Sequence, residues 1–237
     1  MFQAPVTLAV LIALWQDTAA LHQFRTPAPD DEIAAAEHRL GLRLPQSVQA
    51  LYRFSNGLSL NDGNLTIHPL LEPDSVGSLV SMSDQVRKWG WRTPDEVLVF
   101  GANGSGEPYG LWTGRRNAWR FPEPIIHIGA IFEPGCMGLT APSLLSFLLR
   151  ETVLGLVLAN QQHALLLHLA AYGLPEDGLP SSTEIDALLA MSPSADAQSA
   201  GRRLAALERW CLGGAMPDHD DPYRARLDGD ALEALLN

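Results

Sequence analysis

The chain contains little cysteine and little positive charge. Its 237 residues include only two cysteines, Cys136 and Cys211, which are too few for a disulfide framework. Free thiols are the norm in a reducing compartment, so we expect a cytoplasmic protein. Lysine and arginine number 16 against 27 acidic residues, which gives a net charge of -11. Because affinity for phosphates comes mainly from lysine and arginine, this balance argues against nucleic-acid binding and favours a basic protein partner.

Long hydrophobic runs are also absent. The apolar stretch 6–15 has ten residues, about half of what a membrane-spanning helix requires. A secretory signal peptide carries a basic residue before its apolar run, whereas the first basic residue here is Arg25. Small residues at 18–20 leave secretion as the alternative. We therefore expect no membrane association and a first helix with Leu11 and Trp15 facing the core.

The chain lacks the common catalytic motifs. The glycine-rich segment 101–106 has the wrong spacing for a dinucleotide loop, and Pro108 follows it where that loop needs a helix. The segment therefore predicts a hairpin turn. Cys136 has His127 nine residues upstream, but no third group is marked to orient a base. We expect no catalytic residue and no cofactor.

Metal-binding spacings are missing too. The acidic segment 218–221, with Asp228 and Asp230 beyond it, does not match a calcium loop. His163 and His168 are five residues apart, whereas helical ligand pairs are four apart. We expect a solvated loop and no metal. The alternative of a small hydrolase or metal-dependent enzyme rests on Cys136, His127 and the acidic grouping from Asp218 to Asp230 alone.

Residues 31–57 predict two short helices joined by a tight corner. Acidic residues stand in the first turn of the first helix, where they interact favourably with the helix dipole. Gly41 ends this helix and Pro45 opens the next. The dipeptide Asn56-Gly57 ends the second helix. All of these residues can be explained by capping and packing.

The rest of the chain changes from strands to helices. Residues 65–134 alternate short apolar runs with turns, including a strand pair, 110–113 and 117–121, and a strand at 125–128. From Pro142 onward the pattern is helical. We therefore predict an α+β fold: a twisted antiparallel sheet of about four to six strands flanked by helices. Residues 1–155 form this domain, and residues 156–237 form a mainly helical extension packed on it.

Arginine and tryptophan alternate in two places, around residues 87–92 and 115–120. Such a pattern can bind single-stranded nucleic acid by stacking bases on aromatic rings. The negative charge of the chain opposes this interpretation. We expect instead that the tryptophans pack inside and that the arginines cover them or pair with acids.

Four motifs follow one another in the first 150 residues. The helix corner contains Ile33, Glu37, Leu40, Gly41, Leu44, Pro45, Leu51, Asn56 and Gly57, and segments 65–70, 97–109 and 142–148 follow it. Together they resemble the N-terminal signature, the first strand, the glycine-centred hairpin and the closing helix of the SUKH superfamily (Smi/Knr-type domains), in the expected order. The resemblance covers residues 5–150, and Glu107 stands where an aspartate is usual.

The resemblance implies a non-enzymatic protein-binding domain. Many SUKH members are bacterial immunity proteins that bind and neutralise a cognate toxin, frequently a nuclease. The alternative within the same family is a regulatory or scaffold protein of the fungal cell-wall-regulator type. Aromatic anchors and acidic side chains on loops and strands would contact the partner. The candidate binding residues are Asp74, Trp89, Trp91, Glu107, Tyr109 and Trp112.

Overall fold

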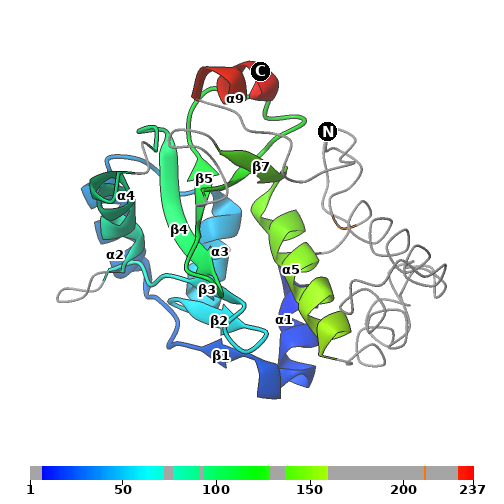
Figure 1. Cartoon of the computed structure of the whole chain (residues 1–237). Coiled ribbons are helices and arrows are strands. Elements are labelled where there is room, and N and C mark those ends of the chain that lie inside the picture. Colours follow the sequence, from blue (N-terminus) through cyan, green and yellow to red (C-terminus); the bar gives the residue numbers. More distant parts are fainter. Residues whose placement is uncertain (1–6, 72–76, 91–92, 129–136, 160–210, 212–228) are drawn as a thin grey trace, which may run out of the picture.

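The computed structural model describes residues 7–71, 77–90, 93–128, 137–159, 211 and 229–237. A central sheet is flanked by helices (Figure 1). The helices are α1 (Leu8–Asp17), α2 (Asp30–Leu40), α3 (Gln46–Phe54), α4 (Leu79–Lys88), α5 (Leu144–Leu158) and α9 (Gly229–Leu236). The strands are β1 (Gln23–Phe24), β2 (Leu58–Leu60), β3 (Leu65–Ile67), β4 (Val97–Asn103), β5 (Pro108–Trp112), β6 (Ile125–His127) and β7 (Gly138–Ala141).

The sheet is a simple antiparallel meander in which the strands lie in the order of the sequence, β1 to β7. The α+β fold and the antiparallel sheet are confirmed. The sheet has seven strands, slightly more than the four to six predicted. The two-residue β1 and the three-residue β2 are too short to produce a clear period of two in the sequence.

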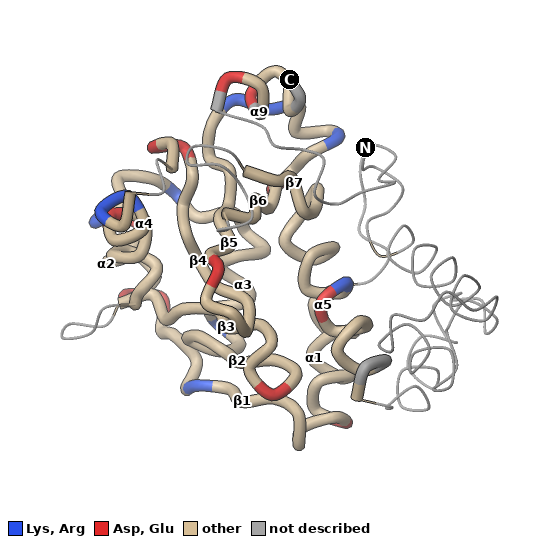
Figure 2. Tube along the Cα trace, in the orientation of Figure 1, with Lys and Arg blue, Asp and Glu red and all other residues tan. Residues whose placement is uncertain are grey.

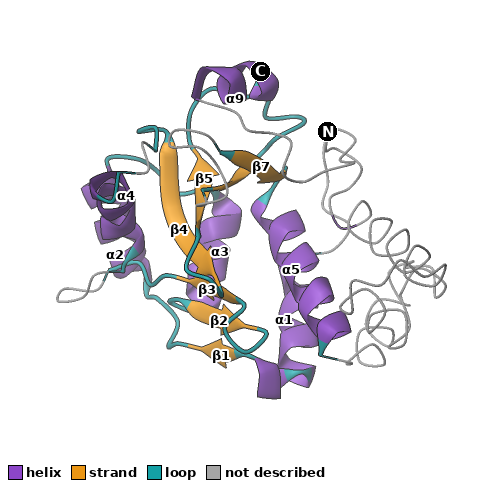
Figure 3. Cartoon of the chain, viewed as in Figure 1, coloured by secondary structure: helices purple, strands orange, loops and turns teal. Residues whose placement is uncertain are grey.

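Buried apolar side chains pack on both faces of the sheet, and Figure 3 shows the helices that surround it. Alternate residues of β4 point to opposite sides, so Leu98 and Phe100 join the larger core while Val97 and Val99 join a smaller one. Helices α1, α3 and α5 contribute to the larger core. Helix α4 covers the other face, where Met82 packs in the smaller core.

The predicted helix pair is confirmed. Three acidic residues occupy the first turn of α2, and Gly41 caps its end in the left-handed conformation, with φ of 68°. Pro45 immediately precedes α3. The buried side of α3 is formed by Val48, Leu51 and Tyr52. The first helix, the hairpin of β4 and β5, β6 and α5 also lie where the sequence predicts them.

Two predictions about the middle of the chain were wrong. The region 65–134 contains the helix α4, which begins at a capping box formed by Ser78 and Ser81. The predicted strand pair 110–113 and 117–121 does not form, because β5 pairs with β4 and β6. Residues 117–121 form a turn instead.

The predicted helical extension lies mostly outside the described residues. Within it, α9 is described, and its Leu236 is buried in the smaller core. Cys211 is buried in the larger core. The division into residues 1–155 and 156–237 stays a prediction. Among the helices that the structure describes, none combines the length and apolarity needed to cross a bilayer.

Candidate functional site

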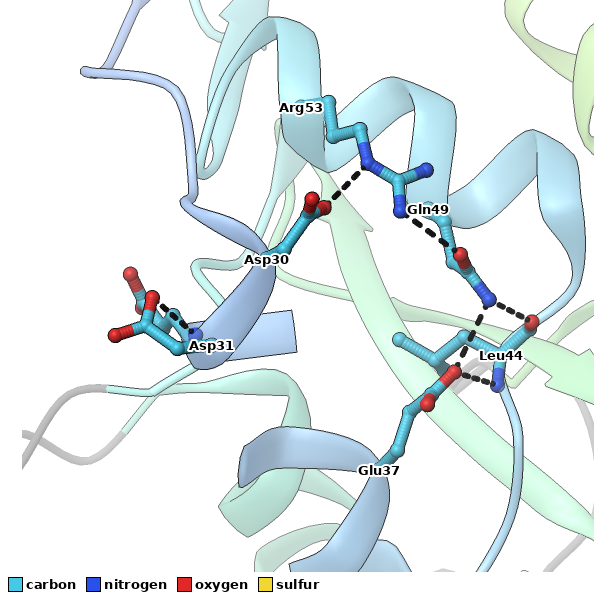
Figure 4. A network of polar contacts seen from close by, with 7 residues as sticks. Asp30, Asp31, Glu37, Leu44, Gln49 and Arg53 are labelled. Atoms are coloured by element: carbon cyan, nitrogen blue, oxygen red, sulfur yellow. Dashed lines mark hydrogen bonds and ion pairs between the residues drawn. The ribbon is translucent and has the colours of Figure 1, made fainter. Parts of the chain in front are cut away.

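The signature residues of the helix corner form a polar network (Figure 4). Glu37 of α2 accepts hydrogen bonds from the backbone N–H of Leu44 over 2.9 Å and from Nε2 of Gln49 over 3.1 Å. The same Gln49 amide donates to the carbonyl of Leu44 over 2.9 Å. Arg53 pairs with Asp30 over 2.8 Å across the two helices. Glu37 therefore stabilises the corner between α2 and α3, and its carboxylate is already occupied by hydrogen bonds within the protein.

The Asn56-Gly57 pair is equally structural. Asn56 donates from Nδ2 to Glu32 over 2.7 Å, and its Oδ1 accepts from the N–H of Leu70 over 2.9 Å. Gly57 has φ of 94°, and a Cβ there would lie 3.0 Å from the backbone nitrogen of Pro69. The family-like motif thus specifies the fold, and the binding surface has to be sought elsewhere.

Glu107 belongs to a half-buried polar cluster at the turn of the β4–β5 hairpin. Its Oε2 accepts from Nδ2 of Asn103 over 3.1 Å and lies 3.2 Å from Nε2 of His127. Burial lowers the pKa of His127; the nearby Arg150 also lowers it, and Glu107 opposes both effects. The imidazole also stacks against Tyr109, with ring centroids 5.0 Å apart. This arrangement holds the hairpin against its neighbours.

Two predicted binding residues are buried. Tyr109 packs edge-on against Phe147 in the larger core, with centroids 4.7 Å apart. Trp112 lies on the opposite face of the sheet, in the smaller core, and donates from Nε1 to the carbonyl of Arg115 over 3.0 Å. Because both faces of the sheet are covered, the side chains of its strands are enclosed on either face, and neither ring is accessible to a partner. Asp74 and Trp91 lie outside the described residues.

Trp89 is exposed, as a binding role requires. It follows α4 directly, and 53% of its surface is accessible. Gly90 then reverses the chain with φ of 85°.

Trp119 is the exposed aromatic residue that the sequence interpretation missed. It lies in the loop of residues 113–124 between β5 and β6, here called the Trp119 loop, and 66% of its surface is accessible. The expectation that it packs inside was wrong. Phe121, two residues later, is fully buried and fills that position in the smaller core. The alternation of arginine and tryptophan was the sequence feature that could have indicated an exposed aromatic residue here.

Hydrogen bonds fix both ends of the Trp119 loop. Thr113 donates its backbone N–H and its hydroxyl to the carbonyl of Glu96, each over 2.7 Å. Arg116 spans the loop and donates to the carbonyls of Pro122 over 3.0 Å and Gly114 over 3.2 Å. Its guanidinium is therefore used to hold the loop in shape.

Asn117 organises the tip of the loop. Its backbone N–H donates to the carbonyl of Leu236 in α9 over 2.6 Å. Its carbonyl accepts from the N–H groups of Arg120 over 3.0 Å and Phe121 over 2.8 Å. Its side-chain oxygen accepts from the N–H of Trp119 over 3.1 Å. The exposed indole thus stands on a backbone fixed from several directions.

The catalytic and metal alternatives gain no support. In the part of the chain that the structure describes, no three His, Cys, Asp or Glu side chains come together as a metal site. Cys136, segment 218–221 and the histidines His163 and His168 lie outside the described residues. Segment 101–106 ends β4 and forms the predicted hairpin turn, where the N–H of Gly106 donates to the carbonyl of Asn103 over 2.9 Å.

Comparison with known proteins agrees with this arrangement. The family described as SMI1/KNR4 (SUKH-1) matches residues 27–150, just over half of the chain. No curated protein gives a match. The family supports a domain of the immunity or cell-wall-regulator type, and it is generally non-enzymatic. The matched region runs from the helix corner to α5 and includes the whole β2–β7 part of the sheet, so the chain belongs to the SMI1/KNR4 family (SUKH-1).

Proposed function

We propose that this protein is an immunity protein that binds and neutralises a cognate bacterial toxin without catalysing a reaction. The observation that carries the proposal is the exposure of Trp119 on a loop that hydrogen bonds hold in place. Tryptophan is enriched at protein interfaces, because it combines a large apolar ring with a hydrogen-bond donor. Tryptophan is also among the residues that contribute most to binding energy at protein interfaces.

Trp89 is a second exposed tryptophan. It directly follows α4, whose Met82 and Val86 pack in the smaller core, and the Trp119 loop contributes Phe121 to the same core. Because α4 and the Trp119 loop are already ordered, little conformational entropy would be lost on binding.

The charge of the whole chain bears on the approach of the partner. A net charge of -11 attracts a positively charged protein at long range and raises the association rate. A basic toxin domain, such as a nuclease, fits this requirement, and the proposed place of encounter is the cytoplasm. A regulatory or scaffold role is the alternative within the same family.

Co-expression tests the proposal. Each toxin domain encoded beside this gene is produced in bacteria with and without the protein, and growth is followed. We expect the protein to relieve growth arrest by one of these domains and to form a complex with it on size-exclusion chromatography. Growth arrest that persists for every domain, with no complex formed, would reject the immunity function in favour of the regulatory alternative.

A further inference from the structure

The Trp119 loop concentrates positive charge in a chain that is otherwise acidic. Arg115, Arg116 and Arg120 lie within six residues, and Arg115 and Arg120 are exposed. Figure 2 marks the positions of lysine, arginine and the acidic residues along the backbone. In the described part of the chain, no carboxylate lies within ion-pair distance of these three side chains. Arg116 is engaged by backbone carbonyls. Two guanidinium groups therefore remain beside Trp119 to bind a partner.

The two exposed arginines are attached to fixed parts of the loop. The carbonyl of Arg115 accepts the indole N–H of the buried Trp112 over 3.0 Å, which anchors its backbone to the smaller core. The guanidinium of Arg120 lies 4.8 Å from the ring centroid of Phe121, a cation–π distance. In sequence, Arg115 precedes and Arg120 follows Trp119, so the aromatic residue belongs to the same short loop as two cations whose backbones are held in place.

The charge that a partner meets at the Trp119 loop is positive, whereas the net charge of the whole chain is negative. Salt weakens the interaction between charges more than about 8 Å apart, so the local arginines, more than the net charge, determine which groups bind at the loop. Helix α9 adds Asp230 and Glu233 nearby, and neither forms an ion pair with the loop arginines. These carboxylates and the net charge of -11 disfavour a nucleic acid strand, whose phosphates would extend beyond the loop.

We propose that the partner presents an apolar pocket for Trp119 with carboxylates at its rim that pair with Arg115 and Arg120. A guanidinium binds a carboxylate through two parallel hydrogen bonds, so these pairs would fix the orientation of the docked indole. A toxin of positive net charge can carry such a pocket, because long-range attraction and local pairing act at different distances. The inference rests on the proposed immunity function.

The probe is the toxin domain that the wild-type protein neutralises in co-expression, and binding is measured by biolayer interferometry at several salt concentrations. Trp119→Ala is expected to weaken binding at least about 30-fold, as for a central aromatic anchor. The double variant Arg115→Glu and Arg120→Glu is expected to weaken it about tenfold or more and to reduce its salt dependence. Unchanged melting temperatures would show that the variants are folded.

A matched control reverses two exposed arginines elsewhere. Arg39 and Arg43 lie at and just beyond the end of α2 and are both exposed; Arg43 lies 4.0 Å from Glu37, so the melting temperature of this control is compared with that of the wild type as well. Their double replacement by glutamate changes the net charge equally and is expected to weaken binding less than about threefold.

The outcomes separate the two proposals. If the wild-type protein neutralises no toxin domain, the immunity function fails and this inference fails with it. If it neutralises one and the Trp119 and arginine variants bind as tightly as the wild type, only this inference is overturned. Binding of a 20-nucleotide single-stranded DNA that is lost in Trp119→Ala would overturn it in favour of a nucleic-acid surface.

Discussion

Acidification below pH 6.5 should destabilise this protein through one buried histidine, His22. Its Nδ1 accepts the backbone N–H of Asn61 over 3.3 Å, and its Nε2 lies 2.9 Å from the hydroxyl of Thr18. That hydroxyl donates its only proton to the carbonyl of Leu14 over 2.7 Å, so Nε2 must carry the proton that Thr18 accepts. A second ring proton, on Nδ1, would face the N–H of Asn61.

Burial lowers the pKa of His22 from 6.5 to about 4, although Asp62 opposes the shift. At pH values between about 4 and 6.5, His22 therefore binds a proton in the unfolded chain but not in the folded protein. The free energy of unfolding must fall as the pH falls through this range. The difference amounts to about 2 kcal/mol of unfolding free energy at pH 5 and roughly 3 kcal/mol at pH 4. Above pH 6.5 the effect vanishes.

Urea unfolding at pH 7 and pH 5 measures this difference. Replacing His22 with glutamine removes the titrating group, so the variant should lose about 2 kcal/mol less than the wild type between the two pH values. Other acid-sensitive groups, His127 among them, cancel in this comparison. Parallel losses in both proteins, or a pKa near 6.5 for the His22 ring by NMR, would refute the reasoning.

Three further changes should alter stability, each measured by urea unfolding. Gly155→Ala, normally favourable in a helix, should cost about 1–3 kcal/mol because its Cβ would overlap the side chain of Asn61; an increase in stability would contradict this packing. Glu37→Ala should cost about 1–3 kcal/mol by leaving two donors unpaired, and a neutral result would mean that the corner does not depend on it. Thr152→Val removes the acceptor of the 2.8 Å hydrogen bond from the indole of Trp15 and should lower the free energy of unfolding by about 1 kcal/mol. A double-mutant cycle with Trp15→Phe checks this, because Thr152→Val should cost less once the indole N–H is gone.

The helix corner could be predicted from sequence because its signals are local. Gly41, Pro45 and the acids of the first turn act within a few residues of their position, and the structure uses each of them as a cap or a turn. The hairpin between β4 and β5 was predictable for the same reason. Its turn combines glycine and asparagine in a short segment between two apolar runs.

The exposure of individual side chains was harder to predict, because it depends on contacts with residues that are distant in the sequence. Tyr109 and Trp112 were chosen as contacts, yet the sheet is covered on both faces and encloses them. Trp119 was expected inside, yet Phe121 fills that place. The prediction of strands throughout residues 65–134 missed the helix α4, because its capping box is formed by two serines, Ser78 and Ser81, and lacks the Glu or Gln that marks this motif in a sequence.

Titration of the toxin domain with this protein tests the central claim, that neutralisation works by stoichiometric binding through an exterior surface. The residual activity of a fixed amount of toxin is measured against increasing amounts of protein. We predict a linear fall that reaches its floor at one equivalent, with intact toxin recovered after the complex is dissociated. Complete loss of activity at a small fraction of an equivalent, with altered toxin recovered, would show turnover and contradict the account.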